Sequence, residues 1–93
     1  SSLEFTNIDD YSKALSYHKA QDVFKDHAND TVIASDTIVV IDNEILGKPK
    51  NKEDAFRMLK SLQGRKHVVI TSVCIMHKDK IDTFLECVIK RLN

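Results

Sequence analysis

The residues with the clearest capacity for chemistry lie in the stretch TVIASDTIVVIDNEILGKP, residues 31–49. Asp36 stands within β-branched and apolar residues typical of a buried strand, where an unpaired carboxylate costs on the order of several kcal/mol. Lys48 follows between Gly47 and Pro49. Glycine allows close approach of the backbone and proline fixes it, so this segment holds a compact cation after the strand returns.

A carboxylate beside a lysine can hold a divalent cation, or accept a proton from a water that attacks phosphorus, while the ammonium offsets charge on phosphate oxygens. This pattern indicates phosphoanhydride hydrolysis. Two other interpretations stay open. Asp36 and Lys48 can form a surface ion pair worth less than about 1 kcal/mol. Alternatively, Asp36 can face solvent or accept a hydrogen bond from Ser35, Thr37 or Thr71.

Other nucleophile, metal and nucleotide motifs are missing from the sequence. His18, His27, His67 and His77 lack the H-E-x-x-H spacing of a zinc site, so most are expected at the surface or at helix caps. No glycine follows Ser35 as in a nucleophile elbow, and a chain with two glycines contains no glycine-rich phosphate loop.

Composition predicts one small globular domain over residues 1–93. Lys+Arg 14 balances Asp+Glu 14, so no net field attracts a nucleic acid polymer or an anionic membrane. No run approaches the roughly 20 apolar residues of a membrane span, and the first ten residues do not resemble a signal peptide. We therefore expect a cytoplasmic protein in which Cys74 and Cys87 are reduced thiols rather than a disulfide.

The first half of the chain predicts a helix followed by a hairpin. Residues 9–26 have near-helical spacing of apolar or small side chains, with Asp9 or Asp10 available as N-cap. The apolar face is expected to contain Tyr11, Ala14, Leu15, Ala20, Val23 and Phe24. Residues 31–41 predict an interior strand that turns at Asp42-Asn43 into a short antiparallel strand over 44–46.

The second half repeats this order. Asn51 is expected to cap a helix that runs to about Leu62, with Asp54 at its third position and Gly64 after its end. Residues 67–76 and 81–92 predict two strands joined by a polar turn. The order of helices and strands predicts an α/β fold, a mixed sheet flanked by helices.

These motifs together resemble the Maf family of nucleoside triphosphate pyrophosphatases, whose fold is an ITPase-like α/β core. The likeness covers about residues 10–76 and rests on Ser35-Asp36-Thr37, Gly47-Lys48-Pro49, the helix that ends at Gly64, and the strand from His67 to Thr71. The segment HKAQDV also resembles a lysine-alanine helix of the family, which indicates Lys19.

The resemblance implies hydrolysis of dTTP, UTP or modified nucleotides to the monophosphate and pyrophosphate with Mg²⁺ or Mn²⁺. It implies that Asp36 is the base or metal ligand and that Lys19 and Lys48 contact phosphates. Thr37 would help select the base, with Ser35 beside it in the substrate site. The acid-threonine pair and the histidine that opens the later strand are similar to the dTTP and UTP branch.

The chain departs from the family pattern at both ends. Residues 1–93 contain neither the serine-rich loop that ends in arginine nor the later lysine-alanine-glycine segment and closing glutamine, so we expect a Maf-like domain truncated at both ends. The alternative hypothesis is a homologue without catalysis that serves as a binding or self-associating module. Exposed sheet edges would then favour a homodimer.

Overall fold

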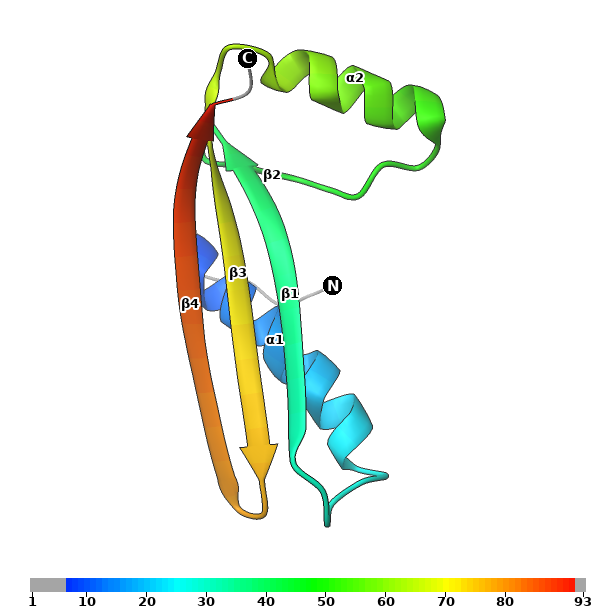
Figure 1. Cartoon of the computed structure of the whole chain (residues 1–93), viewed down its shortest axis with the longest axis vertical. Helices are drawn as coiled ribbons and strands as arrows, with labels where there is room; N and C mark the ends of the chain where they lie inside the picture. The colour runs from blue at the N-terminus through cyan, green and yellow to red at the C-terminus, as the bar shows by residue number, and fades with distance from the viewer. Residues whose placement is uncertain (1–6, 92–93) are drawn as a thin grey trace. The chain divides into compact units, whose positions relative to one another are not determined.

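The computed structural model describes residues 7–91, which form two helices and four strands (Figure 1). In chain order these are helix α1 (Ile8–Phe24), strands β1 (Val32–Ile41) and β2 (Glu44–Leu46), helix α2 (Lys52–Leu62), and strands β3 (Lys66–His77) and β4 (Lys80–Arg91). The expected order of elements is confirmed.

Helix α1 begins one residue earlier than predicted, and its buried face matches the expected one only in part: Ala20 is buried and Phe24 packs against the core, whereas Val23 is exposed. Its N-cap is Asn7, whose side chain accepts a hydrogen bond of 2.8 Å from the backbone N–H of Asp10. The predicted caps, Asp9 and Asp10, instead lie in the first turn, where acidic side chains complement the helix dipole. The fully buried side chains of the helix are the small residues Ser12, Ser16 and Ala20, and the larger Tyr17 and Phe24 are partly buried beside them.

The first hairpin and α2 follow the sequence prediction closely. Asp42 and Asn43 have φ of 52° and 64°, the left-handed conformation of a two-residue hairpin turn, and Ile41 pairs with Glu44. Helix α2 has Asn51 as its N-cap, which accepts a 2.8 Å hydrogen bond from the backbone N–H of Asp54. Gly64 follows the helix at φ 69°.

The strands form one sheet in the order β2-β1-β3-β4. Thr31 bonds His77 at 2.7 Å and Thr37 bonds Thr71 at 3.1 Å, so residue numbers rise along β1 as they fall along β3. The β1-β2 pair is also antiparallel, and β3 and β4 form a hairpin (Figure 1). The α/β class is confirmed, and the described sheet is antiparallel rather than mixed.

The chain divides into two compact units, and β1, β3 and β4 contribute residues to both. The α1 unit comprises Ser1–Thr37 and Thr71–Glu86, and the α2 unit comprises Ile38–Ile70 and Cys87–Asn93. The expectation of a single domain stays a prediction. Neither helix within residues 7–91 is long and apolar enough to cross a membrane.

Each unit has its own buried residues. In the α1 unit the helix packs on the sheet through a core of Ala20, Val32, Cys74 and Met76, against which Tyr17, Phe24 and Ala34 lie. In the α2 unit the buried side chains are Ile38, Val40, Ile41, Leu62, His67 and Ile70.

Asp54 at the start of α2 has a lowered pKa, so its contribution to stability should depend on pH. The side chain of Arg57 donates to Asp54 at 3.1 Å and the backbone N–H of Lys50 donates at 3.0 Å, and in that order they hold the pKa of Asp54 below its ordinary value. A carboxyl whose folded pKa is depressed stabilises the fold above its unfolded pKa, and this is lost as pH falls through the folded pKa. Arg57→Met should therefore raise the pKa of Asp54, measured by carboxyl carbon NMR during a pH titration. An unchanged pKa would contradict this assignment.

Candidate functional site

Asp36 lies on the face of β1 that α1 covers. Side chains alternate along a strand, so Asp36 shares this face with Val32, which belongs to the core under α1. The side chain of Asp36 retains 21% of its exposure. The acid is therefore largely shielded by the protein and still reachable from solvent.

Lys19 brings a cation from α1 to this acid. Its Nζ donates a 2.8 Å hydrogen bond to the backbone carbonyl of Ser35 and lies 3.9 Å from Oδ1 of Asp36. The Lys19 side chain is 59% exposed, so the ammonium is fixed at its tip without being buried. Lys19 and Asp36 therefore meet within the α1 unit, as a common role toward a phosphate would require.

Ser35 and Thr37 occupy the opposite face of β1 from Asp36, because the strand alternates. Ser35 contributes its backbone carbonyl to Lys19. Thr37 pairs with Thr71 on the neighbouring strand through their hydroxyls at 3.1 Å. The predicted roles of Ser35 and Thr37 toward a substrate stay predictions, and the contacts observed are with the protein itself.

Ser72 is a residue of this region that the sequence did not single out. It is completely buried, and its Oγ donates to the backbone carbonyl of Ser12 in α1 at 2.7 Å and lies 3.5 Å from that of Asp36 in β1. The sequence offered one signal: Ser72 lies two residues from both Ile70 and Cys74, so the alternation of the strand places its side chain on the same buried face.

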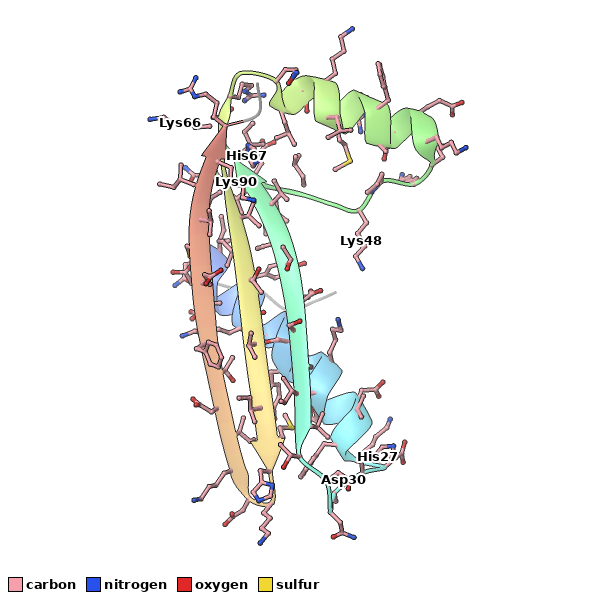
Figure 2. The ribbon with its side chains drawn as sticks, viewed as in Figure 1. His27, Asp30, Lys48, Lys66, His67 and Lys90 are labelled. Carbon is pink, nitrogen blue, oxygen red and sulfur yellow. The ribbon has the colours of Figure 1, made fainter. Side chains whose placement is uncertain are left out.

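Lys48 lies in the α2 unit, on the connection between β2 and α2. Its side chain is exposed and projects from this segment (Figure 2). Within residues 7–91 it makes no ion pair with an acidic side chain. The expected convergence of Lys48 with Asp36 and Lys19 stays a prediction.

The remaining titratable candidates behave mainly as structural residues. Three histidines are exposed as expected: His18 contacts Tyr17 edge-on, His27 lies 3.3 Å from Asp30, and His77 bonds Thr31. His27 and Asp30 both follow α1 (Figure 2). His67 differs, because it is buried at the start of β3.

The cysteines form no disulfide in the structure, and the possible metal ligands form no large cluster within residues 7–91. Cys74 is buried and Cys87 is exposed, and both are free cysteines in the structure. No group of three or more His, Cys, Asp or Glu side chains within residues 7–91 is arranged to hold a metal ion. Asp36 therefore belongs to no such group of three within these residues, and a carboxylate of this kind fits Mg²⁺ or Mn²⁺ where the other ligands are mainly waters and substrate phosphates.

The fold is that of an α/β protein. Beside its sheet, the partly exposed ammonium of Lys19 is paired with the carboxylate of Asp36. The family model described as Maf-like protein matches residues 2–91. This chain belongs to the Maf-like protein family.

Proteins named dTTP/UTP pyrophosphatase are among its relatives. The chain is 52% identical to the protein of this name from Ruminiclostridium cellulolyticum over 68 residues, which cover 73% of this chain and 35% of the relative. It is also 52% identical to that of Thermosipho africanus over 75 residues, 81% of this chain and 38% of the relative. It is 41% identical to the protein of Halalkalibacterium halodurans over 78 residues, which cover 84% of this chain and 41% of the relative. The chain therefore spans about two fifths of the length of these relatives.

The position of Lys19 can be tested by a zero-length cross-link. A carbodiimide joins a carboxylate to an amine only when they are in contact, so we expect an amide between Lys19 and Asp36, detected by mass spectrometry of a digest. Lys25 and Asp22, whose charged atoms are 2.9 Å apart on the same helix, are the positive control. If the control pair links and Lys19 links only to other acids, the observed pairing is contradicted.

Proposed function

We propose that this chain contributes a catalytic part of a nucleoside triphosphate pyrophosphatase that acts on dTTP and UTP. Water would hydrolyse the triphosphate to the monophosphate and pyrophosphate. The observation that carries the proposal is the pairing of Lys19 with Asp36 at 3.9 Å. Membership of the Maf-like family and the names of the relatives support the same reaction.

Each residue of the site has a distinct proposed role. Asp36, partly exposed, accepts a proton from the attacking water or contributes one ligand to a divalent cation. Lys19 and Lys48 contact phosphate oxygens, where positive charge stabilises the transition state. Ser35 holds the Lys19 ammonium through its carbonyl. Thr37 influences the choice of base.

A divalent cation belongs to this proposal. Asp36 would hold Mg²⁺ or Mn²⁺ together with waters and phosphate oxygens, which is how Mg²⁺ usually binds at phosphate sites. When bound, the cation neutralises charge on the phosphates. The exposed amine of Lys19 then supplies a second positive charge on the same side of the strand.

Pyrophosphate release from dTTP and UTP, with Mg²⁺ or Mn²⁺ present, tests this function. Asp36→Asn keeps the shape of the side chain but removes its basicity and negative charge. We expect its turnover to fall by at least about 100-fold, within the range for a lost general base.

The matched control is Asp22→Asn. Asp22 is an exposed acid of the same unit that is paired with Lys25, so its loss should change turnover by less than about twofold. Equal turnover of the parent chain and Asp36→Asn would reject the proposed function.

A second function, self-association, is favoured by the edge position of β4. In the strand order β4 has β3 as its one neighbour among the described strands, and its exposed large apolar residues are Ile81, Phe84, Val88 and Ile89. An edge strand presents unpaired backbone groups that pair readily with another strand. The proposed partner is β4 of a second copy of this chain.

Light scattering at several concentrations tests the dimer. Phe84→Lys places a charge on the edge strand, which opposes pairing, and should raise the dimer dissociation constant by about tenfold, or ~1.4 kcal/mol. Phe56→Lys is the control, because Phe56 is also exposed but lies on α2. A parent chain that is monomeric at all concentrations would exclude this function.

A further inference from the structure

Three elements of the α1 unit meet at one hydroxyl group. Ser72 of β3 is fully buried, donates to the Ser12 carbonyl of α1 at 2.7 Å, and lies 3.5 Å from the carbonyl of Asp36 in β1. We propose that Ser72 is a positioning residue that holds α1 where Lys19 reaches Asp36. This inference rests on the proposed function for its effect on catalysis, but its geometric part can be tested separately.

Helix geometry connects the contact at Ser12 with the ammonium of Lys19. The two residues are seven positions apart, which is almost two complete turns at about 3.6 residues per turn. They therefore lie on nearly the same side of α1. A displacement or rotation of the helix at Ser12 is carried by the rigid backbone to Lys19, whose Nζ must stay close to the Ser35 carbonyl and Asp36.

The other buried serines of this face make no hydrogen bond to the sheet through their hydroxyls, among the residues that the structure describes. Ser16 is equally buried, but its Oγ donates within α1, to the carbonyl of Lys13 at 3.1 Å. The Oγ of Ser12 is buried without a hydrogen-bond partner among the described residues. Of these three buried serines, Ser72 alone joins the helix to the sheet through its hydroxyl.

The small side chains make this contact both possible and necessary. Ser12, Ser16 and Ala20 let the helix backbone approach the sheet, where larger residues would keep it away. Such small residues interlock less with the sheet than large ones do, and the larger Tyr17 and Phe24 pack against the core beside them. The carbonyl of Ser12 can still accept its intrahelical hydrogen bond when Ser72 is changed, so α1 should persist and only its placement should alter.

The decisive comparison is Ser72→Ala against Ser16→Ala. Both substitutions remove a fully buried hydroxyl, but only the first removes a bond between helix and sheet. We expect Ser72→Ala to lower the carbodiimide cross-link between Lys19 and Asp36 at least about threefold, while Ser16→Ala leaves it unchanged. Ser72→Cys, which keeps a weaker donor of similar size, should give an intermediate yield.

A double-mutant cycle tests the effect on catalysis. If Ser72 acts through Lys19, Ser72→Ala should reduce kcat about tenfold in the parent chain and have no further effect once Lys19→Met is present. Independent, multiplicative losses would overturn this pathway. The separation of kcat from KM adds a second check, because misplacement of a paired cation should lower kcat more than it raises KM.

The outcomes separate this inference from the proposed function. A Ser72→Ala chain that keeps the parent cross-link yield, or a Ser16→Ala chain that loses as much, overturns the positioning role whatever the activity. If the parent chain and Asp36→Asn release pyrophosphate equally, the proposed function fails. A cross-link that still depends on Ser72 would then uphold the geometric role alone.

Discussion

The close approach of α1 to β1 and β3 is the constraint on which the site depends. The carboxylate and the ammonium come from different elements, so their distance is set by the spacing between helix and sheet rather than by any local sequence. Small residues at Ser12, Ser16 and Ala20 permit that spacing, and a hydroxyl from Ser72 fixes it. The apolar core of Ala20, Val32, Cys74 and Met76 holds the same helix against the sheet by burial of apolar surface.

The alternation of the strand divides the motif at residues 35–37 into two parts. Asp36 faces α1, whereas Ser35 and Thr37 face the other side of the sheet. Ser35 nevertheless reaches the site through its carbonyl, which accepts the Lys19 hydrogen bond. Thr37 bonds Thr71, so its side chain joins β1 to β3 next to Asp36. A motif that reads as one unit in sequence thus serves both the site and the strands that carry it.

Local signals predicted the elements well, and the contacts between them poorly. The turn at Asp42-Asn43 and the cap at Asn51 depend on neighbouring residues alone, and both were correct. The expected face of α1 was correct at Ala20 and Phe24 but missed the buried Ser12 and Ser16, because apolar periodicity cannot reveal a helix that packs partly through serines. Ser72 was missed for the same reason, since its importance comes from a carbonyl sixty residues away.

The exposure of Lys19 explains why a weak ion pair can still be useful. At 3.9 Å the ammonium is at the outer range of an ion pair with Asp36, while the Ser35 carbonyl at 2.8 Å holds it firmly. An ammonium has three protons, and the carbonyl requires one of them. The other two remain available to the carboxylate and to an incoming phosphate, because this side chain is 59% exposed. A backbone carbonyl carries no titratable proton, so the hydrogen bond from Lys19 to Ser35 does not depend on the charge of a side chain. The pair therefore has a fixed member and an accessible one, an arrangement that suits the phosphoanhydride hydrolysis proposed above.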